Sequence, residues 1–174
     1  TYKPNLNQLR RTAEELAKAR KPIILAGGGV IMANASEVLC ELAHELDIPV
    51  ATTLMGLGAF PANGDLWLGM VGMHGTYAAN MSINHADLLV CVGARFDDRV
   101  TGRLQDFASH ARIVHIDIDP TSIRKNVEVD VPVVGDCRNS LVAIREHLAA
   151  REPLPWKERF AAWQGQLDEW KQEQ

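Results

Sequence analysis

The chain has 174 residues, of which 47% are hydrophobic and 23% charged, enough apolar material for one domain with a real core. Its net charge of −4 gives no electrostatic basis for binding nucleic acid or an anionic membrane. No apolar run approaches the roughly 20 residues of a membrane span, so we expect no nucleic-acid partner and no membrane partner.

The three cysteines, Cys40, Cys91 and Cys137, lie far apart and form no CxxC pair. Their spacing predicts neither a disulfide framework nor a zinc site, and we expect no metal ligands in this chain. The amino end is polar and has no features of a signal peptide. These features together favour a reducing, cytoplasmic compartment.

The first half of the chain alternates helical and extended patterns. In order, it predicts a helix with an apolar face from Leu6 to Ala17, capped by Asn5 or Asn7, a strand over 22–26, a helix over 38–46 and a strand over 48–53. Residues 55–73 contain five glycines and one proline, which predicts a long, shaped loop.

The second half continues this alternation. In order, it predicts a helix over 76–86, a strand over 87–92, a strand over 112–119 that Pro120 stops, a short helix from Thr121, a strand over 131–134 and a helix over 139–150. Strands and helices at this spacing predict an α/β fold. We expect a doubly wound, Rossmann-like parallel sheet of about six strands, counting one over 68–71, with helices on both faces.

A break marked by Pro153 and Pro155 separates residues 1–150 from a final segment, 151–174. That segment predicts one helix with an apolar stripe formed by Trp156, Phe160, Trp163, Leu167 and Trp170. Such a stripe is too apolar to be left in water. It packs either on this domain's own core or on a partner domain, and the proline-marked linker favours the partner domain.

The segment from Gly72 to Gly102 contains the strongest functional signal. An apolar run over 88–92 leads into Gly93 and then into a charged group formed by Arg95, Asp97, Asp98 and Arg99. A buried parallel strand delivers such groups into a ligand crevice at its carboxyl end. Two arginines and two aspartates favour a ligand with phosphate or carboxylate groups, and a solvated ion-pair cluster is the alternative.

Other strand ends also carry candidate ligand contacts. The glycines at 27–29 lie between a strand and a helix, where they suit a pyrophosphate, but a plain tight turn is equally open because the spacing is not GxGxxG. We assign Asp117 to a ribose hydroxyl and Asp119 to capping. For Asp136, ligand binding and capping stay equally open.

His74 lies in a glycine-flanked loop, which implies close backbone approach and favours a ligand contact. Met73 beside it can pack on a flat ring. The sequence contains no Ser-His-Asp arrangement, no Cys-His pair and no Walker loop. We therefore expect a ligand-binding domain without a catalytic set of its own.

Four segments, 53–61, 72–75, 93–99 and 115–120, appear in an order that resembles one family closely. They look like the middle domain of the catalytic subunit of acetohydroxyacid synthase (acetolactate synthase), a thiamine-diphosphate enzyme, with the bacterial biosynthetic large subunit most similar. The resemblance covers most of residues 22–150. It implies that 1–150 are the central FAD-binding domain and that 151–174 lead to a C-terminal domain absent from this sequence.

The resemblance also implies a reaction. The family's first domain supplies a glutamate that activates thiamine diphosphate, and its third domain carries a GDG motif for Mg²⁺ and the diphosphate. The complete enzyme decarboxylates pyruvate and joins the product to pyruvate or 2-ketobutyrate, in branched-chain amino-acid biosynthesis. FAD takes no net redox part. Gly135-Asp136-Cys137 is not the GDG motif, so the chain alone should be inactive. A homo-oligomer and a regulatory small subunit are the implied partners, besides the other domains of the same subunit.

By position, the resemblance implies FAD contacts from residues that follow the strands. These are Gly28 near the phosphates, Thr53 and Leu54 near the flavin, Val71, Gly72, Met73, His74, Gly93, Ala94, Arg95, Phe96 and Asp97 around the cofactor, and Asp117, Ile118, Asp136 and Cys137 near the adenosine. Asp98 and Arg99 should face the channel to the thiamine, where Arg99 meets the carboxylate of the second keto acid and the family's herbicide inhibitors bind nearby.

Two other hypotheses stay open. The chain could be the middle domain of another thiamine-dependent carboligase or decarboxylase that binds ADP or nothing, although the Met73-His74 pair and the 95–99 run argue against this. It could also be a non-enzymatic assembly module whose working surface is the tryptophan stripe.

Overall fold

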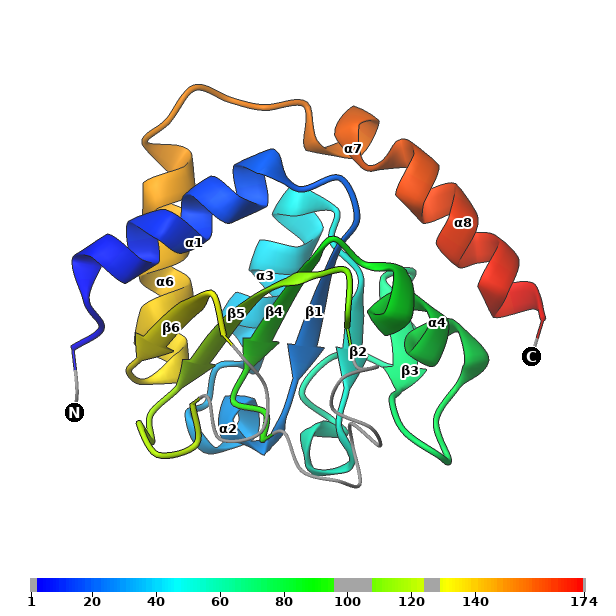
Figure 1. The fold of residues 1–174 in the computed structure, drawn as a ribbon, viewed down its shortest axis with the longest axis horizontal. Helices are drawn as coiled ribbons and strands as arrows, with labels where there is room; N and C mark the ends of the chain where they lie inside the picture. The colour runs from blue at the N-terminus through cyan, green and yellow to red at the C-terminus, as the bar shows by residue number, and fades with distance from the viewer. Residues whose placement is uncertain (1–2, 96–107, 124–128, 174) are drawn as a thin grey trace.

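The computed structural model describes residues 3–95, 108–123 and 129–173, and the strands within them form one parallel sheet. They are β1 (Pro22–Ala26), β2 (Val50–Thr52), β3 (Trp67–Met70), β4 (Leu88–Val92), β5 (Arg112–Asp117) and β6 (Val131–Val134). Their order is β3-β2-β1-β4-β5-β6, and the labelled strands run in one direction in Figure 1. The predicted doubly wound sheet is confirmed, with β3 as its sixth strand.

Helices connect the strands, and several of them begin at a residue whose side chain caps them. They are α1 (Leu6–Lys18), α2 (Gly28–Met32), α3 (Ser36–Leu46), the 3-10 turn η1 (Leu54–Gly56), α4 (Tyr77–His85), α6 (Cys137–Ala149), α7 (Trp156–Arg159) and α8 (Ala161–Gln172). The side chain of Asn5 accepts hydrogen bonds from the amides of Asn7 and Gln8, so Asn5 caps α1. Helix α6 begins at Cys137 rather than at residue 139, because Asp136 caps it.

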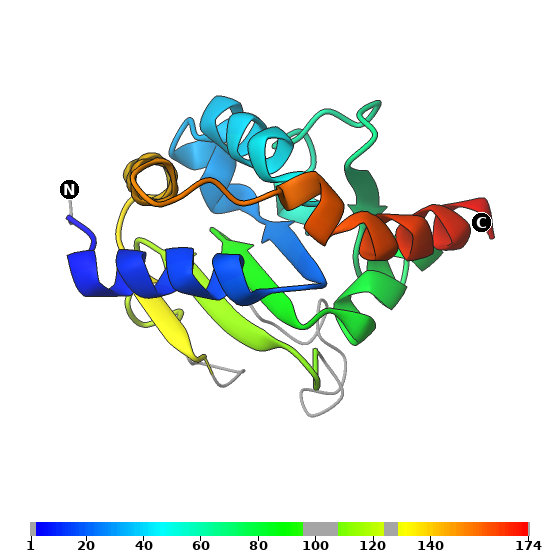
Figure 2. The same ribbon diagram turned by 90° about the horizontal axis from the view of Figure 1, so that it is seen from above.

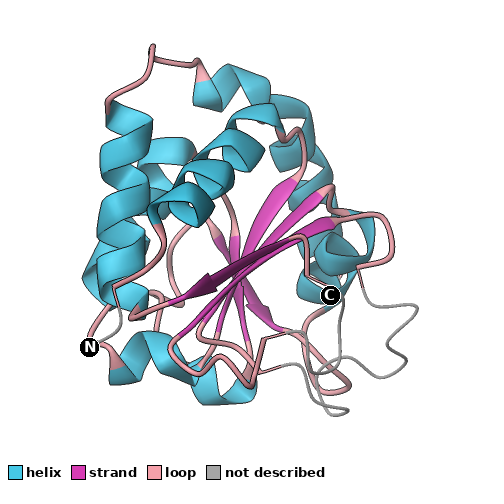
Figure 3. Ribbon diagram, turned by 60° about the vertical axis from the view of Figure 1, so that its left-hand side comes forward, coloured by secondary structure: helices cyan, strands magenta, loops and turns pink. Residues whose placement is uncertain are grey.

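The sheet separates two hydrophobic cores, since alternate residues of a strand face opposite sides. In β1, Ile24 and Ala26 belong to the core under α1, α3 and α6, whereas Ile23 and Leu25 belong to the core under α4 and α8. Burial on both faces explains the continuous apolar runs of the central strands. In Figure 2, α3 and α6 lie on one side of the strands and α4 on the other, and Figure 3 shows the helices around the twisted sheet.

The aromatic stripe near the carboxyl end packs on this chain itself. Its two helices, α7 and α8, meet at Phe160, where the sequence predicted a single helix. Phe160 is buried in the first core, and Trp163, Leu167 and Trp170 are buried in the second. Nε1 of Trp163 also donates to the carbonyl of Pro22 at 2.8 Å. The expectation that the stripe docks on a partner domain is therefore wrong, because the chain's own cores already cover it.

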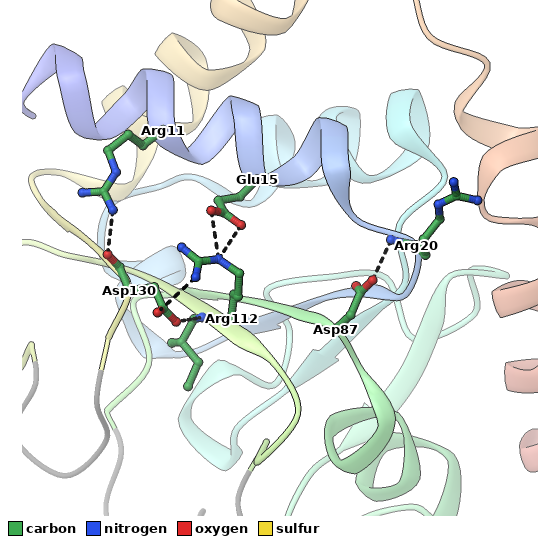
Figure 4. Close-up of polar contacts among 7 residues, drawn as sticks. Arg11, Glu15, Arg20, Asp87, Arg112 and Asp130 are labelled. Carbon is green, nitrogen blue, oxygen red and sulfur yellow. Dashed lines mark hydrogen bonds and ion pairs between the residues drawn. The ribbon is translucent and has the colours of Figure 1, made fainter.

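Polar contacts tie α1 to the amino ends of the strands (Figure 4). At the start of β5, Nε of Arg112 donates to Glu15 of α1 at 2.9 Å. The carboxylate of Asp87, just before β4, accepts the amides of Arg20 at 2.8 Å and Lys21 at 2.9 Å. These contacts hold together the edge of the sheet at the amino ends of the strands. Doubly wound sheets bind ligands at the opposite edge, where the carboxyl ends of the strands lie.

Replacing Trp163 with alanine should lower the free energy of unfolding by about 3–5 kcal/mol, because it removes a buried ring from the second core. Urea unfolding followed by circular dichroism measures the change. Gly165→Ala in the same helix is the matched control, since a Cβ there meets no atom within 4 Å and alanine favours a helix. Equal stabilities for the two variants would show that α8 adds nothing to the core.

Candidate functional site

The sheet reverses its winding between β1 and β4, and this switch point is where open α/β sheets bind ligands. We use "switch-point edge" for the loops that follow the carboxyl ends of β1 to β6: 27–29, 53–57, 71–76, 93–95, 117–121 and 135–137. All the described residues that the sequence assigned to ligand binding lie on this edge. Phe96, Asp97, Asp98 and Arg99 lie outside the described residues.

Backbone packing explains two of the three glycines after β1. A Cβ on Gly27 would lie 2.3 Å from the carbonyl oxygen of Gly93, and one on Gly29 would lie 2.7 Å from the Cα of Gly93. The amide of Gly27 donates to Val92 at 2.9 Å, and that of Gly29 donates to Gly93 at 3.0 Å. The turn after β1 is thus held directly against the end of β4.

Gly28 differs from its two neighbours. A Cβ there would first meet the Cβ of Met55, at 3.2 Å, and Gly28 stays partly exposed. Met55 is itself an exposed side chain. Gly28, the glycine assigned to phosphate, is therefore the one of the three with the most room for a Cβ.

In the loop after β2, Thr53 has a structural role and Leu54 is exposed to solvent. The Thr53 hydroxyl accepts the amide of Gly56 at 3.2 Å and so caps η1, and the amide of Thr53 donates to Ala26 at 3.0 Å. Thr53 is buried, whereas the side chain of Leu54 is 65% exposed. Of the two residues assigned to the flavin side, Leu54 is the one available for contact.

The loop after β3 presents Met73 and His74. Val71 is buried, but Met73 is 90% exposed and His74 is exposed beside it. The turn closes with a hydrogen bond from the amide of Gly75 to the carbonyl of Gly72, at 3.0 Å. The side chain of Asn80 in α4 bonds both backbone groups of Gly72, each at 2.9 Å. Sequence reasoning missed Asn80, because its polar side chain on a helix gave no sign of this distant partner.

The ends of β4 and β5 are joined through His115. Its Nε2 lies 2.8 Å from the carbonyl oxygen of Ala94 and 3.8 Å from Oδ2 of Asp117. Because a carbonyl can only accept, Nε2 donates to it, which fixes the tautomer of the neutral ring. Burial lowers the pKa of His115, although the Ala94 bond and the charge of Asp117 oppose this. Sequence analysis gave His115 no role of its own.

The two aspartates at the end of β5 and in the loop after it, Asp117 and Asp119, form different hydrogen bonds. Oδ1 of Asp117 accepts the amide of Asp119 at 2.9 Å, and Asp117 keeps a small exposed fraction. Asp119 accepts both the amide and the hydroxyl of Thr121, which confirms its capping role. The Thr121 bonds lower the pKa of Asp119, and the positive charge of Arg95 contributes. Ile118 between them is 49% exposed.

The loop after β6 ends at the start of α6. Asp136 accepts the amide of Asn139 at 2.9 Å, so it caps this helix, one of the two roles that the sequence left open. Cys137 is buried, and burial, with smaller effects from the charges of Asp117 and Asp136, raises its thiol pKa to about 12. A thiol that stays protonated near neutral pH is not a nucleophile. Cys137 is therefore not a nucleophile at this site, and its buried side chain packs in the hydrophobic core.

The switch-point edge combines exposed apolar side chains with a few charges. Leu54, Met73 and Ile118 are exposed on it, as are Arg95 and His74. Within the described ranges, no three His, Cys, Asp or Glu side chains gather where they could hold a metal ion. This chemistry suits a ligand that has both a flat apolar part and anionic or hydroxyl groups.

Fold and site together define a doubly wound α/β domain with a candidate ligand site at its switch-point edge. A model of the "Thiamine pyrophosphate enzyme, central domain" family matches residues 9–144. The chain belongs to this family of thiamine pyrophosphate enzyme central domains, which confirms the family expectation. None of the described helices is both long and apolar enough to cross a membrane.

Three relatives extend this result. The chain is 50% identical over 156 residues to a probable acetolactate synthase large subunit of Methanocaldococcus jannaschii, covering 88% of this chain and 26% of the relative. It is 45% identical over 170 residues to the acetolactate synthase isozyme 3 large subunit of Escherichia coli, covering 96% and 29%. It is 47% identical over 169 residues to acetolactate synthase of Mycobacterium avium, covering 97% and 27%. The chain thus spans between a quarter and a third of these relatives.

Gly27→Ala and Gly29→Ala should each cost about 1–3 kcal/mol of stability or more, because the new Cβ would overlap the backbone of Gly93. Gly28→Ala is the control, since the nearest atom to its Cβ would be the Cβ of Met55 at 3.2 Å, a much milder contact. Thermal unfolding of the three variants measures the difference. If Gly28→Ala is as damaging as the other two, the close contact with β4 does not explain these glycines.

Protonation of His115 should lower the free energy of unfolding as the pH falls below neutral. Its folded pKa lies below the ordinary value of 6.5, so the unfolded chain takes up the proton first as pH falls. The stability contributed by neutral His115 is therefore complete above about pH 6.5 and is lost as pH falls through the folded pKa. His115→Gln, which does not titrate, should lose less stability between about pH 7.5 and 5. Urea midpoints across this range measure it, and parallel curves for both proteins would refute the assignment.

Proposed function

We propose that this chain is the FAD-binding central domain of an acetolactate synthase (acetohydroxyacid synthase) large subunit. The observation that carries the proposal is its 42–50% identity to proteins named acetolactate synthase large subunit, over 88–98% of the chain. Those matches span the whole switch-point edge, from the glycines after β1 to the loop after β6.

The residues of the switch-point edge fit FAD by their chemistry. Asp117 can accept hydrogen bonds from ribose hydroxyls, and Arg95 can pair with the pyrophosphate. The exposed side chains of Leu54 and Met73 offer apolar surface to a flat ring. Gly28, Val71, Gly72, His74, Gly93, Ala94, Phe96, Asp97, Ile118, Asp136 and Cys137 complete the proposed set of cofactor contacts.

A doubly wound sheet divides a dinucleotide between its two halves. The half formed by β1 to β3 contributes Leu54, Met73 and His74, and the half formed by β4 to β6 contributes Arg95 and Asp117. We therefore place the flavin over the first half and the adenosine over the second. FAD takes no net redox part in the main reaction, so the task of these residues is to bind and orient it.

The reaction belongs to the whole protein. We propose that it decarboxylates pyruvate and joins the product to pyruvate or 2-ketobutyrate, with thiamine diphosphate and Mg²⁺ held by domains beyond this chain. Asp98 and Arg99 would face the channel to the thiamine, and Arg99 would meet the substrate carboxylate. The proposed partners are those other domains, reached through the segment 151–174, further copies of the subunit and a regulatory small subunit, in the cytoplasm.

Binding of FAD, ADP and NAD to the purified chain tests the cofactor proposal. We expect FAD to raise the melting temperature most and its fluorescence to change on binding. Stabilisation by ADP alone would favour the central domain of another thiamine enzyme, and stabilisation by none of the three would count against FAD binding by this chain.

Arg95→Ala and Asp117→Asn should each weaken FAD binding about 10- to 100-fold, because each removes a charge-assisted hydrogen bond worth about 1.5–3 kcal/mol. Asp119→Asn is the matched control, since its carboxylate is engaged by Thr121. Fluorescence titration gives the three affinities. Equal FAD affinity in Asp117→Asn and Asp119→Asn would refute the role of Asp117.

A further inference from the structure

The side chain of Asn80 forms a matched pair of hydrogen bonds with the backbone of one residue. Its Oδ1 accepts the amide of Gly72 at 2.9 Å, and its Nδ2 donates to the carbonyl of Gly72, also at 2.9 Å. Two bonds from one planar amide fix both the position and the orientation of that backbone. Asn80 lies in α4, eight positions further along the chain, so the pair joins the helix to the loop that precedes it.

Gly72 is the residue at which this loop changes direction. Its φ is 111°, a conformation that side-chain-bearing residues rarely adopt. The Gly72 carbonyl also accepts a hydrogen bond from the amide of Gly75, at 3.0 Å. The amide of Thr76 donates to the carbonyl of Met70 at 2.9 Å. The turn over 72–75 is therefore closed by its own backbone, and Asn80 fixes it to α4.

The helix does not need Asn80 for its own start. Thr76 caps α4, because its hydroxyl accepts the amide of Ala79 at 3.1 Å. Asparagine is a poorer helix former than alanine in a helix interior. The contact with Gly72 is the physical reason for asparagine at this position, and what it fixes is the turn that presents Met73 and His74 to solvent.

We propose that Asn80 is a positioning residue that sets the Met73–His74 turn for the ring system lying over the β1–β3 half of the sheet. The proposal rests on the proposed function. It gives Asn80 a ligand-selective effect, since the adenosine contacts are proposed for β4–β6, and these strands form the other half of the sheet. Asn80 should therefore matter for FAD and not for ADP, which lacks a second ring system.

The test compares Asn80→Ala with Asn84→Ala, one helical turn further along α4. Fluorescence and calorimetric titrations give the affinities of each protein for FAD and ADP. We expect Asn80→Ala to weaken FAD binding about tenfold and to leave ADP affinity near that of the wild type. Asn84→Ala should change none of these values.

Amide hydrogen exchange of Gly72 in the ligand-free chain gives an independent readout. Exchange should be about tenfold faster in Asn80→Ala than in the wild type. Asn80→Asp should fall between them, because a carboxylate still accepts the Gly72 amide but cannot donate to its carbonyl. Unchanged exchange in Asn80→Ala would show that the pair does not hold the turn.

The binding results separate the two proposals. If the wild type does not bind FAD, the proposed function fails and the ligand-selective role of Asn80 fails with it. If the wild type binds FAD and Asn80→Ala binds it equally well, the proposed function stands and the role of Asn80 is refuted. An equal loss of FAD and ADP affinity would also refute it, because Asn80 would then support the domain as a whole.

Discussion

The backbone contact between the turn after β1 and the end of β4 is the constraint on which the site depends. Gly27 and Gly29 lie so close to Gly93 that no side chain fits between them. This contact fixes the first loop of one half of the sheet against the first loop of the other. Leu54 follows β2 and Arg95 follows β4, the two strands on either side of β1, so a ligand that spans both halves meets a prepared surface.

Side chains that never need to touch the ligand hold the outer loops in a similar way. Asn80 bonds the backbone of Gly72, and His115 bonds the backbone of Ala94. In both cases a side chain on a regular element is attached to a loop that also carries exposed side chains, Met73 and His74 after β3 and Arg95 after β4. Support of this kind makes a site more rigid than its loops alone would be.

Much of this arrangement is local and could be read from the sequence. Several strands are predicted by apolar runs that lead into glycine or aspartate. Asn5 and Asp136 cap helices by bonding residues two or three positions further along the chain. Asn80 and His115 act on partners that only the folded chain brings together, so no pattern marks them. The tryptophan stripe was assigned to the wrong surface for the same reason, because hydrophobicity shows that a stripe is buried without showing where.

The placement of α7 and α8 bears on how the chain unfolds. Phe160 closes the core on one face of the sheet, and Trp163 closes the core on the other. The last helices therefore link two cores that the sheet would otherwise keep apart, which favours a single cooperative transition over separate loss of each face. The family match ends at residue 144, so the cooperative folding unit is longer than the segment that defines the family.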